Sequence, residues 1–196
     1  MDHIAKQDRS RKRIEIILET AEKILLEDGI DQVTVANISN RSGLKRTSTY
    51  KFFQTPEAIK SMLISNYLNI CAIDFEEKTS NINTSEPSVV VMRSVEILFN
   101  FYSEYESAQK LLLSSSVILP FEKEPFHFLS NKIQSFVEMN ISLPDIFNKD
   151  GVFRVITQII LSIFALNTKE SGSLNEVGKI EAVSYTHLRA HETYVH

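Results

Sequence analysis

A stretch of twelve residues, SGLKRTSTYKFF from Ser42 to Phe53, combines three cationic side chains with four small hydroxyl side chains and three aromatic rings. Cationic groups neutralise phosphates, and small hydroxyl groups hydrogen-bond to phosphate oxygens or to base edges. The side chains of the stretch with this capacity are Lys45, Arg46, Thr47, Ser48, Thr49, Tyr50 and Lys51. Their chemistry suits the binding of a polyanion, provided that the local structure turns them to one side.

The overall charge of the chain does not favour a polyanion partner, but the distribution of the charge does. The 196 residues carry a formal net charge of -4. Residues 1–60 contain 11 Lys and Arg against 9 Asp and Glu, whereas residues 61–196 contain 10 against 16. A polyanion is therefore expected to meet the N-terminal third of the chain.

Little in the sequence favours an enzyme. There is no glycine-rich phosphate loop and no zinc-ligand spacing, and His127, between two phenylalanines, is more often a core or surface residue than a general base. The single cysteine, Cys71, lies among apolar residues and is expected to fill core space. His187 and His191 are four residues apart, but no third ligand is evident nearby, so neither a metal site nor a cofactor is predicted.

The residues before the cationic stretch predict two helices of unequal length. Apolar residues recur on one helical face between residues 14 and 25, and Gly29 follows as a residue that can close a helix in the left-handed conformation. Thr34 is expected to cap a short helix over residues 35–41, and Gly43 is expected to end it.

The rest of the chain also reads as helical. A third helix is expected over residues 45–53, and Thr55 and Pro56 suit the start of a fourth that reaches about residue 75. Residues 77–87 are rich in Ser, Thr and Asn and predict a loop. Further helices are expected at residues 89–105, 108–117, 126–141 and 152–166. Since no strand-like alternation persists, the predicted fold class is all-α.

A short helix, a turn with glycine and a second short helix form a helix-turn-helix unit, whose second helix enters the major groove of DNA. From about residue 13 to residue 63 the sequence resembles the N-terminal domain of the TetR family of bacterial transcriptional regulators. The residues that carry the resemblance are Gly29, Thr34, Ile38, Gly43, Tyr50, Phe53 and Glu57. The resemblance implies a three-helix DNA-binding domain over residues 1–54, followed by a helical bundle over residues 55–183 that binds a ligand and forms a dimer.

The resemblance also implies which side chains face double-stranded DNA. They are Thr34, Lys45, Arg46, Thr47, Ser48, Tyr50 and Lys51. Thr47 and Thr49 stand where the family commonly has Gly and Leu, so base contacts are expected to differ. Pro56 stands where the family often has a phosphate-binding Lys, so one backbone anchor is expected to be missing. Thr34 caps a helix whether or not DNA is near, and Lys51 also suits a solvated surface.

For the bundle, the resemblance implies a small ligand. No cationic cluster in the sequence marks a phosphate or carboxylate ligand, which favours an apolar or amphipathic one. The candidate pocket residues are Tyr67, Cys71, Met92, Phe99, Tyr102 and Phe126, although aromatic residues at helical spacing more often form plain core. The resemblance implies a homodimer built from residues 152–166 and a last helix. The expected function is a ligand-responsive regulator, by the family's usual outcome a repressor at an inverted-repeat operator. The alternative is a helical carrier or adaptor for an apolar ligand that does not bind DNA.

Two features bear on the ends of the chain. Residues 184–196, SYTHLRAHETYVH, look like translated adapter or vector sequence, so a last helix starting near Leu174 is expected to be cut short around Glu181. No apolar run is long enough to span a bilayer, and the polar N-terminus lacks a signal region. The sequence therefore predicts a cytoplasmic protein without a membrane partner.

Overall fold

The computed structural model describes residues 2–112, 123–145 and 147–192, with the backbone alone for residues 2–6 and 187–192. These residues form helices and connecting turns, and the prediction of an all-α fold is confirmed. Contacts divide the chain into two compact units, one that includes residues 1–64 and one that begins at Ser65. The division falls inside a continuous helix, whereas the predicted boundary at residues 54 and 55 precedes that helix.

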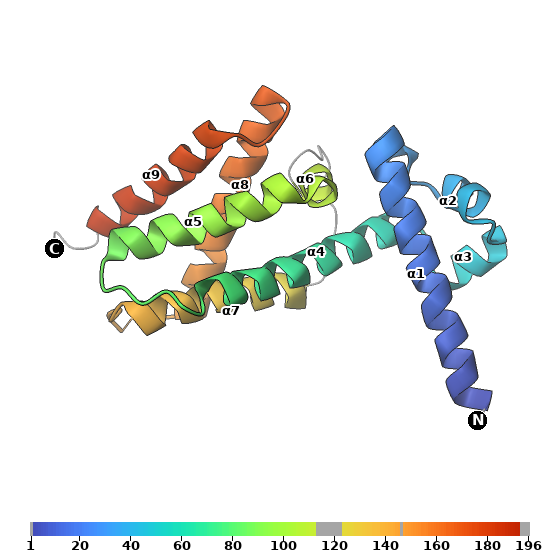
Figure 1. Ribbon diagram of the computed structural model, residues 1–196, viewed down its shortest axis with the longest axis horizontal. Coiled ribbons are helices and arrows are strands. Elements are labelled where there is room, and N and C mark those ends of the chain that lie inside the picture. Colours follow the sequence, from blue (N-terminus) through green and yellow to red (C-terminus); the bar gives the residue numbers. More distant parts are fainter. Residues whose placement is uncertain (1, 113–122, 146, 193–196) are drawn as a thin grey trace. The chain divides into compact units, whose positions relative to one another are not determined.

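The first unit contains four helical elements and the start of a fifth (Figure 1). They are α1 (Asp2–Asp28), the 3₁₀ turn η1 (Ile30–Gln32), α2 (Val35–Ser42), α3 (Arg46–Phe52) and α4 (Pro56–Thr79). The apolar stripe of α1 forms the centre of its core, and α2 and η1 both pack against α1. The buried apolar side chains of the unit are Ile17, Ala21, Ile24, Leu25, Val33, Val35, Ile38, Phe53, Ile59, Leu63 and Ile64.

The first helix is longer than predicted. Its apolar periodicity starts at Ile14, but the helix begins at Asp2. The basic residues Arg9, Arg11 and Arg13 therefore lie on a helix rather than on an extended tail. Arg and Lys have good helix propensity, so these turns need no buried face to be helical once the rest of α1 is packed.

Two glycines set the turns that bracket α2. Gly29 (φ 90°) follows α1, and Gly43 (φ 71°) is the left-handed C-cap of α2. Side chains with a Cβ rarely adopt these angles, so both predicted helix ends depend on glycine. The α4 helix starts as predicted, because the Thr55 hydroxyl accepts a hydrogen bond of 3.2 Å from the N–H of Ala58.

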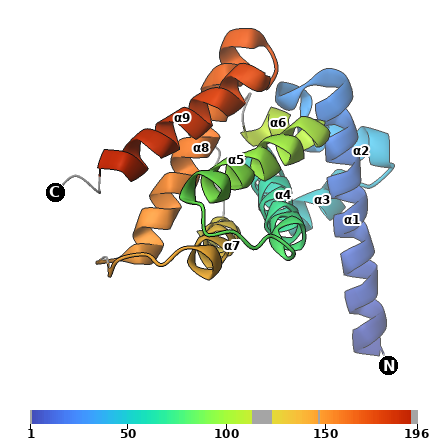
Figure 2. The same cartoon turned by 60° about the vertical axis from the view of Figure 1, so that its left-hand side comes forward.

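The second unit is a helical bundle (Figure 2). After the end of α4, its elements are α5 (Pro87–Glu104), α6 (Glu106–Leu112), α7 (Lys123–Asn140), α8 (Lys149–Ser171) and α9 (Glu176–Glu192). α8 packs against both α7 and α9, and α5 packs against α9. Ring contacts tie the elements together, with centroids 6.0 Å apart for Phe75 and Phe136 and 6.2 Å apart for Phe99 and Phe164.

Within the described residues, α8 is the one helix that is long and apolar enough to cross a membrane by length and composition. Part of its apolar surface is buried inside the unit, including Phe153, Ile160 and Phe164. Core helices that pack on several sides meet the same criteria, so this property is weak evidence for a membrane span.

Asn167 on α8 links the last two helices, because its side-chain amide is hydrogen-bonded to Asn175 in the turn between α8 and α9. Its side-chain oxygen accepts a hydrogen bond of 3.0 Å from the N–H of Asn175, and its Nδ2 donates to Asn175 Oδ1 at 3.2 Å. A Cβ on Gly178 would lie 2.7 Å from Asn167 Cγ, so the glycine permits the close approach of α9. The prediction that the last helix stops around Glu181 is wrong, because α9 continues to Glu192.

Candidate nucleic-acid interface

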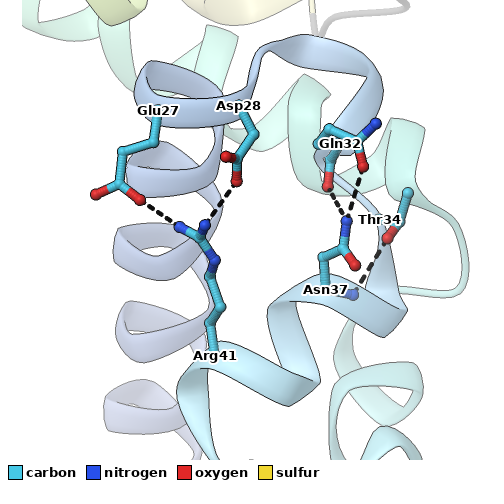
Figure 3. Close-up of polar contacts among 6 residues, drawn as sticks. All are labelled: Glu27, Asp28, Gln32, Thr34, Asn37 and Arg41. Carbon is cyan, nitrogen blue, oxygen red and sulfur yellow. Dashed lines mark hydrogen bonds and ion pairs between the residues drawn. The ribbon is translucent and has the colours of Figure 1, made fainter.

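The N-terminus of α2 is fixed by two polar side chains (Figure 3). Thr34 has an extended backbone, and its hydroxyl accepts a hydrogen bond of 3.2 Å from the N–H of Asn37. The Asn37 side chain donates to the backbone carbonyl of Gln32 at 2.9 Å and to its side-chain oxygen at 3.2 Å. The predicted capping role of Thr34 is confirmed, since its oxygen satisfies an N–H that the first turn leaves open.

The C-terminal end of α2 is tied to α1 by Arg41 (Figure 3). One guanidinium nitrogen of Arg41 donates to Glu27 at 2.5 Å and the other donates to Asp28 at 2.7 Å. The hydrogen bond with Glu27 is the main reason why the pKa of Arg41 is raised above its ordinary value. Exposed ion pairs contribute little to stability, but a planar guanidinium that engages two carboxylates fixes a direction. Arg41 therefore orients α2 on α1.

The α3 helix presents its cations and hydroxyl groups outward. Lys45, Arg46, Thr47, Tyr50 and Lys51 are exposed, and Ser48 is partly exposed. Thr47 and Lys51 are four residues apart and share the helix face that points away from Thr49. The structure thus brings six of the seven predicted DNA-facing residues onto one two-turn segment, while Thr34 lies at the start of the neighbouring helix α2.

Thr49 differs from its hydroxyl neighbours. The sequence predicts a hydroxyl able to meet phosphate or base edges, but Thr49 is 0% exposed and is the one buried residue within α3. Its Oγ1 lies 3.3 Å from the Oγ of Ser39 on α2, which is also buried. The expectation of an outward Thr49 is therefore wrong, because the period of the short helix turns this position toward α2.

Three residues that position the interface were missed at the sequence level. Nothing in the sequence indicates the partners of Asn37 and Arg41, because these are set by the packing of α2 on η1 and α1. Ser39 carried a signal, since it follows Val35 and Ile38 at spacings typical of a buried helix face. A shallow polar depression lies beside these contacts and is lined by Asp28, Gln32, Asn37, Asn40 and Arg41.

The predicted ligand-pocket residues all belong to the second unit, and five of the six are buried. Met92 is 44% exposed, so the structure does not bring it into the interior with the others. Tyr102 is 0% exposed, and its hydroxyl has no hydrogen-bond partner among the described residues. Burial raises the pKa of the Tyr102 phenol well above its ordinary value, and nearby Cys71 adds to the shift. Burial likewise raises the pKa of the Cys71 thiol, so both groups are neutral near pH 7.

Among the described residues, no group of three or more His, Cys, Asp or Glu side chains is arranged to hold a metal ion. The side chains of His187 and His191 lie outside the described part of the chain. The exposed side chains of α3 offer cations that can meet phosphates, and hydroxyl groups that can meet phosphates or base edges.

No protein-family profile and no curated protein sequence matches this chain. Solved structures do match it. A TetR-family transcriptional regulator from Streptomyces coelicolor has a TM-score of 0.68 and 18% identity, over 95% of this chain and 98% of that one. A proposed TetR-family regulator from Shewanella sp. PV-4 has a TM-score of 0.59 and 11% identity, over 88% and 94%. A regulator of the TetR/AcrR family from Aquifex aeolicus VF5 has a TM-score of 0.52 and 17% identity, over 89% and 98%. The chain therefore has the fold of TetR-family transcriptional regulators, as the motif resemblance implied.

Proposed function

We propose that this protein is a DNA-binding transcription regulator that uses α3 as its recognition helix. The observation that supports the proposal most strongly is the arrangement of α3, which turns Lys45, Arg46 and Lys51 outward while α2 is fixed to α1 by Arg41. A helix positioned in this way can enter the major groove, where hydroxyl and cationic side chains meet base edges and phosphates. Thr34 and Tyr50 complete the proposed contact set.

The proposed regulator acts as a homodimer. The α8 and α9 helices pack on each other and leave apolar residues exposed, with Val155 59% and Leu166 56% exposed on α8, and Val177 56% and Ile180 60% exposed on α9. Two neighbouring helices with such stripes favour burial against a second copy of the same surface. A two-fold dimer places two recognition helices on an inverted-repeat operator.

The proposed effector is a small apolar or amphipathic molecule bound inside the second unit. The supporting observation is the buried hydroxyl of Tyr102, which lacks a partner within the described part of the chain and whose raised pKa favours its neutral form. A neutral hydroxyl in an apolar interior suits an uncharged ligand that brings a hydrogen-bond acceptor. Ligand and DNA must then weaken each other's binding by the same factor if the ligand favours a conformation that binds DNA poorly. Because α4 runs from the first unit into the second, it is the proposed lever of this coupling.

Repression is the proposed outcome of operator binding, the proposed location is the cytoplasm, and no catalytic step is part of the proposal. The competing function is a carrier or adaptor for an apolar ligand without DNA binding. That alternative draws on the same buried aromatic residues of the second unit and assigns no role to the outward cations of α3.

The dependence of DNA affinity on salt distinguishes these two functions. Each neutralised phosphate contributes about -0.9 to the slope of log K against log salt, so the three cations of one α3 give about -2.7. The test measures binding of a fluorescent duplex, recovered from a randomised pool, between 50 and 200 mM salt by anisotropy. We expect the Lys45→Ala, Lys51→Ala variant to lose about 1.8 of slope per copy.

A matched control removes an exposed lysine of the same unit that is not on α3, as in Lys23→Ala. We expect this control to retain the wild-type slope. If the affinity of the wild-type protein barely responds to salt, and if the α3 variant binds as well as the wild type, the carrier function is supported and the regulator is not.

A further inference from the structure

Among the described residues, one side-chain hydrogen bond joins the proposed recognition helix α3 to another helix of its unit. Thr49 is the one buried residue among the seven residues of α3, and its Oγ1 lies 3.3 Å from Ser39 Oγ. Phe53, just beyond the end of the helix, is also buried. A helix of two turns is thus anchored at its middle by a pair of hydroxyl groups and at its end by an aromatic ring.

The capping and backbone contacts at the start of α3 do not fix its rotation about its own axis. Its N-cap residue, Lys45, makes no side-chain capping bond and uses its backbone carbonyl to accept from the N–H groups of Ser48 and Thr49. Those bonds belong to the helix itself and turn with it. By contrast, the contact between the Ser39 and Thr49 hydroxyl groups joins two helices, and neither buried hydroxyl can exchange its partner for bulk water.

The partner helix α2 is itself held in place. Arg41 ties its end to α1, while Asn37 ties its start to Gln32. These contacts therefore orient α2 relative to α1, and the contact between Ser39 and Thr49 orients α3 relative to α2. The outer residues Thr47 and Lys51 lie on the helix face opposite Thr49, so a rotation about Thr49 changes which groove atoms they can reach.

We propose that the buried Ser39–Thr49 hydroxyl pair positions the recognition helix and thereby sets which DNA sequence the protein prefers. The proposal rests on the DNA-binding function proposed above. It assigns Ser39 and Thr49 as positioning residues that do not touch DNA themselves. Rotation of α3 shifts base contacts, which require alignment, more than phosphate contacts, which long flexible cations can follow. Loss of the pair therefore relaxes sequence preference and leaves the salt slope unchanged.

The test compares five proteins in parallel selections from a pool of randomised duplex DNA. They are the wild type, Thr49→Val, Ser39→Ala, the double variant Ser39→Ala, Thr49→Val, and the control Thr20→Val. Thr20 lies on α1, where its hydroxyl donates to the carbonyl of Ile16, so the control makes the same chemical change outside the α2–α3 contact. The affinity ratio between the selected duplex and a scrambled duplex is then measured for each protein, together with the salt slope and the melting temperature.

We expect Thr49→Val and Ser39→Ala to reduce the affinity ratio at least tenfold at an unchanged slope, and Thr20→Val to retain the wild-type ratio. Each single variant leaves the other buried hydroxyl without its partner, which can itself lower stability. The double variant removes both hydroxyl groups, so it separates the loss of helix positioning from this loss of stability. A double variant that still shows the reduced ratio supports positioning, and a return to the wild-type ratio overturns it. A sixth protein, Thr49→Ser, keeps a hydroxyl and is expected to retain the wild-type ratio, so the inference stays testable even if Thr49→Val folds poorly.

Enrichment by the wild type tests DNA binding, and the comparison of the variants with the wild type tests the positioning role. If the wild type enriches no sequence, DNA recognition itself is wrong, and the positioning role fails with it. If the wild type enriches a sequence and the single variants enrich the same sequence with ratios within twofold, the pair does not position α3 and the regulator function stands.

Discussion

Replacement of Gly178 by alanine is expected to destabilise the second unit, although alanine is the better helix former. In the interior of an ordinary helix, Gly→Ala gains about 1 kcal/mol. Here the new Cβ would lie 2.7 Å from Asn167 Cγ and 2.8 Å from Asn167 Cβ. Asn167 is buried, and its amide is engaged by the N–H and side chain of Asn175 at 3.0 and 3.2 Å.

The magnitude follows from what Asn167 must give up. Displacement of its side chain breaks two hydrogen bonds, at about 1 kcal/mol each, and crowding of α8 against α9 adds about 1 kcal/mol or more. After the propensity gain of about 1 kcal/mol, the net loss in the free energy of unfolding is about 2 kcal/mol. The assay is urea denaturation followed by circular dichroism at 222 nm.

A second background shows whether the clash is the cause. In an Asn167→Gly protein the atoms that the new Cβ meets are absent, so Gly178→Ala is expected to stabilise that background by about 1 kcal/mol. The sign reversal between the two backgrounds is the diagnostic result. If Gly178→Ala leaves the wild-type protein as stable as before, or more stable, the close approach of α9 to Asn167 is refuted.

Three further expectations follow from single contacts. Tyr102→Phe removes a buried hydroxyl that has no partner among the described residues, so the free energy of unfolding measured by urea titration should rise by about 1 kcal/mol. A clear fall would reveal an internal partner. Thr34→Ala deletes the cap of α2 and should cost about 1 kcal/mol by the same assay, whereas Thr34→Ser should retain most of the stability, and equal losses would contradict a capping role. Cys71 is buried and its pKa is raised, so its thiol should resist alkylation at pH 8 in the native protein and react fully in denaturant, as followed by mass spectrometry, and rapid native labelling would contradict its burial.

The sequence predicted those parts of the candidate interface that depend on local signals. Thr34, Gly29 and Gly43 each act within a few residues of their own position. Thr34 caps α2, Gly43 is its left-handed C-cap, and Gly29 follows α1 with a positive φ but not in the left-handed helical conformation. The exposed face of α3 was predictable for a similar reason. When a two-turn helix packs one face against its neighbours, the side chains on its other faces are exposed.

The contacts between helices were not predictable in the same way. Thr49 stands between other small hydroxyl residues, and nothing in its immediate neighbours distinguishes it, since its burial depends on where Ser39 lies on α2. Arg41 is a second example. Its sequence neighbours do not reveal that its guanidinium pairs with two carboxylates at the end of α1. Met92 has the residue type of a pocket residue, but its place on the outer face of α5 leaves it exposed.

Helix ends without an apolar pattern also escaped prediction. The N-terminal turns of α1 and the C-terminal turns of α9 carry mostly polar residues, and periodicity says nothing about them. Both helices continue beyond their apolar stripes. Once the packed part of a helix has formed, each further residue that joins it gains one backbone hydrogen bond without a new nucleation step.

Selection from a pool of randomised duplex DNA by the wild-type protein tests the central claim most directly. A helix-turn-helix unit carried by a two-fold dimer predicts an enriched inverted repeat, with half-sites whose centres are about one helical turn or a multiple of it apart. A pool that remains random after repeated selection at low salt would contradict the claim that α3 reads DNA.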